Sequence, residues 1–192
     1  GDYAMTDTTS AFLGRLAGAL PPGTVIAGSE APERYWHDWS TLAPVRPLAV
    51  ILPRTTEDVA TALRLCSEAG IAAVPQGGLT GLAGGAHPIA GCVVLNVERM
   101  TGVEEVDPVM ATITVLAGTP LAAVQAAADD AGFAFMLDLG ARGSCSIGGN
   151  ISTNAGGNRV IRYGMTRDLV LGLEAVLADG TVVTSLNAML KN

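Results

Sequence analysis

The order of apolar and polar residues predicts helices and strands in alternation over the first half of the chain. Over 8–20, apolar side chains recur at the spacing of one helical face, and a Pro-Pro-Gly sequence follows. An apolar run between Pro47 and Pro53 predicts a short buried strand. The next helix is expected to begin with Thr55 as its cap and to end at Gly70. Its buried stripe is expected to comprise Val59, Ala62, Leu63 and Cys66.

Two more buried strands complete the pattern of the first half: one over 71–75 completes a β-α-β unit, and another is expected over 92–95. The second half of the chain favours antiparallel strands. Residues 103–106 and 112–117 alternate apolar and polar side chains, as strands with one solvated face do. A helix is expected to begin at Thr119-Pro120, with the threonine as its cap and the proline at its first helical position.

A hairpin is predicted near the end of the chain. Asp179-Gly180 is a strong signal for a tight turn, here between strands over 169–178 and 181–184. Mixed helices, parallel strands and hairpins predict an α+β fold with two lobes. The expected divisions are an N-terminal helix and aromatic segment (1–46), a first lobe with a β-α-β unit (47–101) and a larger antiparallel second lobe (102–192).

Two segments concentrate glycine. Residues 76–85 hold five glycines and residues 140–157 hold six, of 24 in the chain. Glycine lets a backbone approach a ligand closely, and the serine, threonine and asparagine residues between them supply hydrogen bonds without filling space. The two segments, called here the first and the second glycine loop, are therefore predicted to form the two walls of a polar ligand groove.

Composition excludes several classes of protein. The net charge is −7, and the eleven lysine and arginine residues are spread along the chain, so a nucleic-acid surface is not expected. No apolar run is long enough to span a membrane. The three cysteines lack a CxxC spacing and His37 and His87 stand alone, so no metal site is expected among these residues. The sparse cysteines also lead us to expect a reducing compartment.

The spacing of the first glycine loop does not suit a Rossmann fingerprint. That motif needs G-x-G-x-x-G at the start of a helix, whereas here the glycines read Gly78-x-x-Gly81-x-x-Gly84 and run into His87-Pro88. The loop instead suits a nest of backbone N–H groups around a diphosphate, with Thr80 adding a hydroxyl group.

The two glycine loops resemble those of a known family. Residues 75–85 resemble the diphosphate loop of the FAD-linked oxidases of the vanillyl-alcohol-oxidase superfamily, and residues 137–157, followed by Arg162-Tyr163-Gly164, resemble their second FAD loop. Residues 173–181 are similar to the strand pair that follows it. The nearest branch is that of D-2-hydroxyglutarate dehydrogenase, D-lactate dehydrogenase and the glycolate oxidase D-subunit. The resemblance implies a truncated two-lobed FAD-binding domain of the PCMH type.

The resemblance also implies which residues bind FAD. In the first loop these are Pro75, Gln76, Gly77, Gly78, Leu79, Thr80, Gly81 and Leu82, with the diphosphate held through backbone N–H groups. In the second loop they are Leu137, Gly140, Ala141, Gly143, Ser144, Ile147, Gly148, Gly149, Asn150, Thr153, Asn154, Gly156 and Gly157. FAD is expected to be non-covalent, because no histidine stands in the first loop and the position of Cys145 is not an attachment site in this branch. Leu79 departs from the family, which usually has asparagine there.

By resemblance, the parent protein oxidises a D-2-hydroxy acid to a 2-keto acid by hydride transfer to flavin N5, and a quinone, cytochrome or electron-transfer flavoprotein then accepts the electrons. The implied location is cytoplasmic, and a homodimer is considered. Relatives continue into a substrate domain with a divalent-metal site, so this chain by itself is expected to be inactive, with no catalytic residue of its own. The open alternatives are a non-catalytic FAD- or nucleotide-binding module or subunit that needs a partner chain, an incompletely folded fragment, and an enoyl-reductase on a similar fold.

Overall fold

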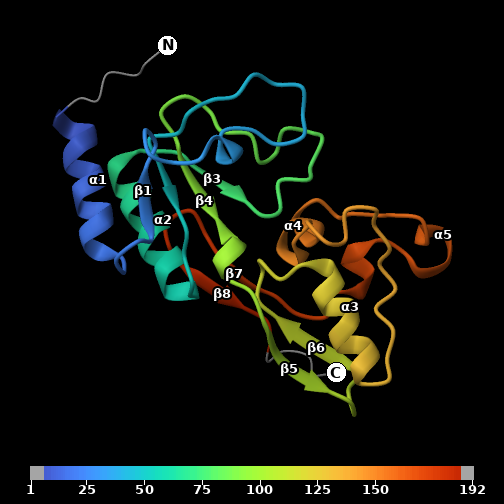
Figure 1. Ribbon diagram of the computed structural model, residues 1–192. Helices are drawn as coiled ribbons and strands as arrows, with labels where there is room; N and C mark the ends of the chain where they lie inside the picture. The colour runs from blue at the N-terminus through green and yellow to red at the C-terminus, as the bar shows by residue number, and fades with distance from the viewer. Residues whose placement is uncertain (1–6, 187–192) are drawn as a thin grey trace.

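A four-stranded sheet organises the first half of the computed structural model, which describes residues 7–186 (Figure 1). Its strands lie in the order β1-β2-β4-β3. β1 is antiparallel to β2, whereas β2, β4 and β3 run parallel to one another. The carboxyl ends of the three parallel strands therefore lie at one edge of the sheet. The bounds are β1 Val25–Ala27, β2 Ala49–Ile51, β3 Ala73–Gln76 and β4 Val93–Asn96.

Two helices, α1 (Asp7–Ala19) and α2 (Thr56–Ala69), cover one face of this sheet. As predicted, Thr55 caps α2, and it forms a capping box with Asp58. Gly70 ends α2 with a φ of 66°, a left-handed conformation that glycine adopts without strain. The core beneath the helices comprises Phe12, Leu16, Leu20, Ala49, Ile51, Val59, Ala62, Leu65, Cys66, Val93, Leu95 and Met100. Leu63 is only partly buried and packs against this core. Leu65, which the predicted stripe omitted, is buried within it.

The opposite face of the sheet is covered by part of residues 28–46, which lie between β1 and β2 and are called here the aromatic segment. This segment includes the short 3-10 helix Glu33–Tyr35. Its core comprises Ala31, Tyr35, Val50, Leu52 and Val94, with Trp36 packed at the margin. Burial on both faces explains the unbroken apolar runs of β2 and β4. Trp39, by contrast, is 72% exposed, so this ring does not hold the segment to the sheet.

A ribbon and a helix follow the sheet. β5 (Val103–Asp107) and β6 (Thr112–Val115) pair antiparallel, as predicted, and α3 spans Leu121–Asp130. The predicted start of α3 was wrong by one residue, because Pro120 is the N-cap and no side chain caps the helix. The hydroxyl group of Thr119 is used elsewhere: it donates to the carbonyl oxygen of Leu116 at 2.7 Å and accepts from the N–H of Gly102 at 3.0 Å.

The second glycine loop is not irregular throughout. It contains α4 (Ile147–Ser152), and α5 (Val160–Tyr163) and a 3-10 helix (Thr166–Leu169) follow it. Ser146 caps α4 by accepting from the N–H of Gly149 at 3.4 Å. This cap is a local signal in the sequence that offsets the low helix propensity of two consecutive glycines.

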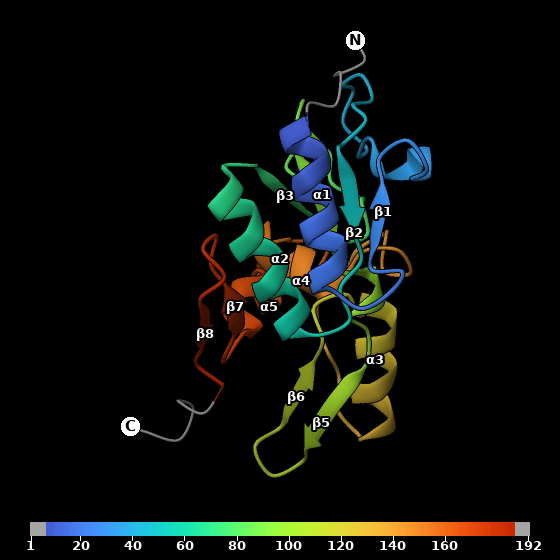
Figure 2. The same cartoon turned by 90° about the vertical axis from the view of Figure 1, so that its left-hand side faces the viewer.

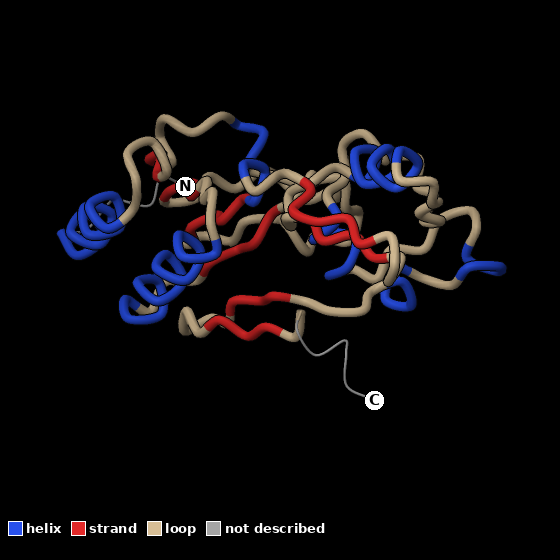
Figure 3. Tube along the Cα trace, turned by 90° about the horizontal axis from the view of Figure 1, so that it is seen from below, coloured by secondary structure: helices blue, strands red, loops and turns tan. Residues whose placement is uncertain are grey.

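A C-terminal hairpin returns to the first half of the molecule. β7 (Glu174–Val176) and β8 (Val182–Thr184) pair antiparallel around the predicted Asp179-Gly180 turn, although the first strand is shorter than the expected 169–178. The hydroxyl group of Thr56 in α2 donates to Glu174 at 2.6 Å, and Val176 packs against the core under α2. Figures 2 and 3 show the hairpin beside α2, away from β5 and β6. Over residues 7–186, no helix is long and apolar enough to cross a membrane.

Candidate cofactor-binding site

The first glycine loop begins at the carboxyl edge of the parallel sheet. It leaves β3 at Gln76, and Asn96 stands opposite Gln76 at the end of β4. In open sheets with parallel strands, ligands bind outside this edge. The topology therefore places the loop where a ligand site is expected.

The two glycine loops are in direct contact. A Cβ atom added to Gly77 would lie 2.2 Å from Ser146 Oγ, and one added to Gly78 would lie 1.9 Å from the carbonyl oxygen of Ser144. Only glycine permits this approach, because any side chain at Gly78 would overlap backbone atoms. The two predicted walls thus meet where 77–78 lie against 144–146.

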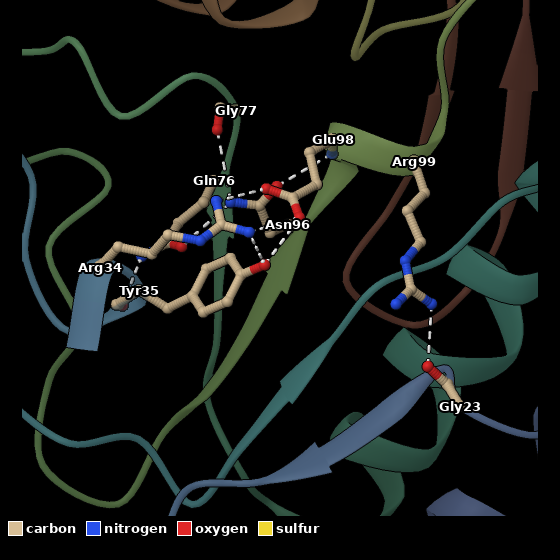
Figure 4. A network of polar contacts seen from close by, with 8 residues as sticks. All are labelled: Gly23, Arg34, Tyr35, Gln76, Gly77, Asn96, Glu98 and Arg99. Atoms are coloured by element: carbon tan, nitrogen blue, oxygen red, sulfur yellow. Dashed lines mark hydrogen bonds and ion pairs between the residues drawn. The ribbon is translucent and has the colours of Figure 1, made fainter. Parts of the chain in front are cut away.

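A polar network lies behind the first loop (Figure 4). The side chain of Gln76 donates to the carbonyl oxygens of Tyr35 at 3.0 Å and Ala86 at 2.9 Å. Asn96 donates to Gln76 Oε1 and to the carbonyl oxygen of Gly77, both at 3.3 Å, and accepts from the N–H of Glu98 at 2.9 Å. The network ties the start of the loop to β4 and to the aromatic segment.

An ion pair closes the network on its outer side. The two terminal guanidinium nitrogens of Arg34 each donate to the carboxylate of Glu98 at 2.8 Å, and Tyr35 donates to it at 2.6 Å. The hydrogen bond from Arg34 is the largest influence that lowers the pKa of Glu98, and the bond from Tyr35 adds to it. Burial and the bond to Glu98 raise the pKa of Tyr35 to about 12.

The aromatic segment also holds the far side of the first loop. The N–H of Trp39 donates to the carbonyl oxygen of Gly81 at 3.1 Å. His87 Nε2 lies 3.0 Å from the carbonyl oxygen of Ala43, and His87 Nδ1 lies 3.9 Å from Asp38 Oδ1, with both side chains buried. Burial acts to raise the pKa of Asp38, but hydrogen bonds from Ser40 outweigh it and hold the pKa below its usual range. His87 is thus a core residue that fastens the end of the loop.

The second glycine loop is held by α3 and its neighbours. The first N–H groups of α3, at Leu121 and Ala122, donate to the carbonyl oxygens of Cys145 and Arg142 at 3.2 and 2.8 Å. Gln125 donates to the carbonyl oxygen of Leu137 at 2.8 Å. The first two contacts use backbone donors that α3 leaves free, and the third uses a side chain of the same helix, so α3 holds the loop at three points.

Small polar residues of the second loop hold its own turns. Thr153 donates to the carbonyl oxygen of Gly149 at 2.9 Å, and Asn154 accepts from the N–H of Arg167 at 3.0 Å with a φ of 49°. Asn150 differs, because its side chain is buried and its Oδ1 atom has no hydrogen-bond partner. A buried acceptor without a partner is costly, which makes Asn150 the polar group of the loop that a bound ligand would complete.

The glycines of the two loops fall into two groups. Gly77, Gly78, Gly148 and Gly157 are pressed against other parts of the chain, whereas an added Cβ atom at Gly81, Gly140 or Gly143 would meet nothing within 4 Å. The first group shapes the loops, and the second borders open space. The uncrowded backbone at these glycines and the unpaired oxygen of Asn150 are features that a polar ligand could use.

The predicted site residues do not all face that space. Leu137 and Ile147 are buried at 3% and 7% exposure, so they support the second loop from within, whereas Leu82 is 73% exposed. Leu79 is half-buried with a φ of 61°. Asn96, which is fully buried behind the first loop, was not among the predicted site residues. A single asparagine at the end of an apolar strand was its one available signal.

Two hollows border the glycine loops. One of about 420 Å³ lies around α5, directly after the second loop, and is lined by Asn158, Arg159, Ile161, Arg162 and Tyr163. Another of about 360 Å³ lies between α2 and β7, and its lining includes Pro75, next to the first loop. All three cysteines are buried and free, and burial raises the pKa of Cys66 to about 11, as suits a core residue. Among residues 7–186, no three His, Cys, Asp or Glu side chains gather as a metal site.

Comparisons with known proteins show what the chain is similar to. The chain is 47% identical over 160 residues to D-2-hydroxyglutarate dehydrogenase of Xanthomonas citri pv. viticola, covering 83% of the chain and 34% of that protein. It is 44% identical over 171 residues to the mitochondrial D-2-hydroxyglutarate dehydrogenase of Bos taurus, covering 89% of the chain and 31% of that protein. The chain thus spans about a third of the length of these relatives.

The fold is shared with a solved structure of p-cresol methylhydroxylase. The two superpose with a TM-score of 0.77 at 20% identity, over 94% of this chain and 36% of that one. The similarity shows the PCMH-type α+β fold, as expected, of which the chain holds a part. Residues 47–185 match the family described as FAD binding domain. The chain therefore belongs to this family of FAD-binding domains.

Proposed function

We propose that the chain is the FAD-binding part of a dehydrogenase that oxidises a D-2-hydroxy acid to a 2-keto acid. The observation that carries the proposal is the contact of Gly77 and Gly78 with Ser144 and Ser146, which joins two distant glycine loops into one site. The family match supports FAD as the ligand, and the dehydrogenase relatives support a hydroxy acid as the substrate of the parent protein.

We further propose how the two loops divide the work. The backbone of 76–82 holds the diphosphate, and the segment 140–157 lines the flavin and ribityl part, with Asn150 as its buried polar contact. Backbone donors suit this task because the protein is acidic overall and few cations are available. Bound FAD supplies the hydride acceptor, and the chain's own residues bind it, orient it and exclude water. The division into an N-terminal segment (1–46) and two lobes (47–101 and 102–192) belongs to the same proposal.

The binding mode and the partners are also proposed. FAD is non-covalent, since the first loop carries Leu79 and Thr80 where a histidine would be needed for attachment. A quinone, cytochrome or electron-transfer flavoprotein takes the electrons. We keep a cytoplasmic location, supported by the three free cysteines, although the Bos taurus relative is mitochondrial. Cell fractionation decides between these two compartments.

An absorption spectrum of the purified chain, taken before and after acid precipitation, tests the proposal. Flavin bands that pass into the supernatant are expected, and bands that stay in the pellet would contradict the non-covalent mode. A chain purified without flavin should be stabilised against heat by added FAD but not by added NAD. Failure of FAD to raise the melting temperature would reject the proposed site.

Activity is tested separately, on a protein of the relatives' full length that contains this chain. Reduction of an artificial electron acceptor with D-2-hydroxy acids, and not with their L enantiomers, is expected. FAD binding without turnover of any D-2-hydroxy acid would favour a non-catalytic FAD-binding module. The non-catalytic module stays open as a second function, because the chain covers only about a third of the length of these relatives.

A further inference from the structure

The side chain of Gln76 spans the base of the first glycine loop. Its Nε2 atom donates to the carbonyl oxygen of Ala86 at 2.9 Å, so one amide group joins the first residue of the loop to the residue that directly follows it. The same nitrogen donates to the carbonyl oxygen of Tyr35 at 3.0 Å, on the segment that covers the sheet. Gln76 is 3% exposed, so water does not compete for these bonds.

The orientation of both carboxamides follows from their partners. Tyr35 and Ala86 offer carbonyl oxygens, so the atom of Gln76 that faces them must be the N–H₂ group. The Oε1 atom of Gln76 then accepts from Asn96, whose own oxygen accepts from the N–H of Glu98. Each amide is thus fixed by the next, and the relay runs from the loop base to β4 (Figure 4).

This relay leaves no free donor on Gln76. Both of its N–H groups are used by carbonyl oxygens of the chain, and both N–H groups of Asn96 are used by Gln76 and Gly77. Neither side chain therefore has a donor left for a phosphate group. A loop with five glycines has high conformational entropy when unrestrained, so closing its base reduces the cost of ordering it around a ligand.

We infer that Gln76 and Asn96 are positioning residues, which clamp the first glycine loop in its binding shape and do not contact the ligand through their side chains. The inference rests on the proposed function, because it takes the diphosphate of FAD as the ligand of the loop. The resemblance places Gln76 among the residues that bind FAD. We limit that role to its backbone, because its side chain holds the loop closed.

Two variants of Gln76 test the clamp. Gln76→Met removes the hydrogen bonds at similar size, and Gln76→Glu removes the donors and adds a negative charge. Hydrogen–deuterium exchange of 77–86, measured without FAD, should become about tenfold faster in both variants, which corresponds to about 1.4 kcal/mol. FAD affinity, measured by fluorescence titration, should fall about tenfold in Gln76→Met, and further in Gln76→Glu at low salt.

The matched control is Gln125→Met. Gln125 also donates to a backbone carbonyl oxygen, that of Leu137, but on the second loop. The control should leave the exchange of 77–86 unchanged. A melting temperature measured for each variant identifies one that has lost its fold. In that case Asn96→Asp takes its place: it removes the donors to Gln76 and Gly77, keeps the oxygen that accepts from the N–H of Glu98 and, like Gln76→Glu, adds a negative charge.

The outcomes separate the clamp from the proposed function. Unchanged exchange without FAD, with weaker FAD binding, would mean that Gln76 contacts the ligand, and the inference would be wrong. Faster exchange with unchanged FAD affinity would also overturn it, because the loop shape would not matter for binding. If the wild-type chain binds no FAD, the proposed function fails, whereas the exchange comparison without FAD still decides whether Gln76 closes the loop.

Discussion

Gly78 lies against Ser144 so closely that an added Cβ atom would stand 1.9 Å from the carbonyl oxygen of Ser144. Gly78 follows the sheet and Ser144 lies in the segment held by α3, so this contact joins the two halves of the molecule. A site built from both loops depends on it, because the backbone of neither loop can approach the other with a side chain in between.

Gly78→Ala should therefore destabilise the FAD-free chain. The added methyl group meets backbone atoms, which cannot move aside as a flexible side chain does, so a loss of about 1–3 kcal/mol is expected. Gly85→Ala is the control, because a Cβ atom there meets nothing within 4 Å. Thermal unfolding of the two variants measures the difference, and equal melting temperatures would show that the loops do not pack in this way.

Leu79 should be a source of backbone strain. Its φ of 61° lies in the left-handed region, which costs a non-glycine residue about 1–2 kcal/mol. Replacing alanine by glycine in a loop ordinarily lowers stability, but Leu79→Gly should be more stable than Leu79→Ala by about 1 kcal/mol. Denaturant unfolding of both variants isolates the backbone conformation from the lost leucine side chain. A more stable Leu79→Ala would contradict the left-handed conformation.

Asn150→Leu should separate ligand binding from stability. The Oδ1 atom of Asn150 is buried without a partner, so an apolar side chain of similar shape should leave the melting temperature of the FAD-free chain unchanged or raised. The affinity for FAD should fall about tenfold, because the amide is expected to contact it. Asn158→Leu, at an exposed position, is the control for FAD affinity. Equal affinities in the two variants would remove Asn150 from the site.

The Arg34–Glu98 pair should make stability depend on pH in the acid range. The folded pKa of Glu98 is lowered, chiefly by Arg34, so its contribution is full above the unfolded pKa of about 4.3 and is lost as the pH falls through the folded value. The free energy of unfolding of the wild-type chain should exceed that of Glu98→Gln by about 1 kcal/mol at neutral pH, and the difference should vanish in acid. Denaturant unfolding across this range measures it, with the exposed Glu104→Gln as control. A difference that persists in acid would argue against the ion pair.

The sequence predicted local features better than long-range ones. The cap at Thr55 and the turn at Asp179-Gly180 each depend on neighbouring residues, and the structure has both. The role of Asn96 could not be predicted, because it depends on the pairing of β3 with β4, which brings Gln76 beside it.

The remaining discrepancies have the same cause. Thr119 has the sequence of a helix cap, but β5 and β6 bring Gly102 within reach of its hydroxyl group, and tertiary hydrogen bonds replace the cap. Trp39 contacts the first loop through its backbone, at the carbonyl oxygen of Gly81, while its ring is exposed. Each of these outcomes depends on which segments the fold places side by side.

Hydrogen–deuterium exchange of the wild-type chain with and without FAD tests the central claim most directly. If one FAD molecule occupies a site made by both glycine loops, exchange should slow in 76–85 and in 140–157 at the same FAD concentration. The hairpin of β7 and β8, which lies beside α2 and belongs to neither loop, should be unaffected and serves as an internal reference (Figure 2). Protection of one loop alone, or of neither, would contradict a single site shared by the two.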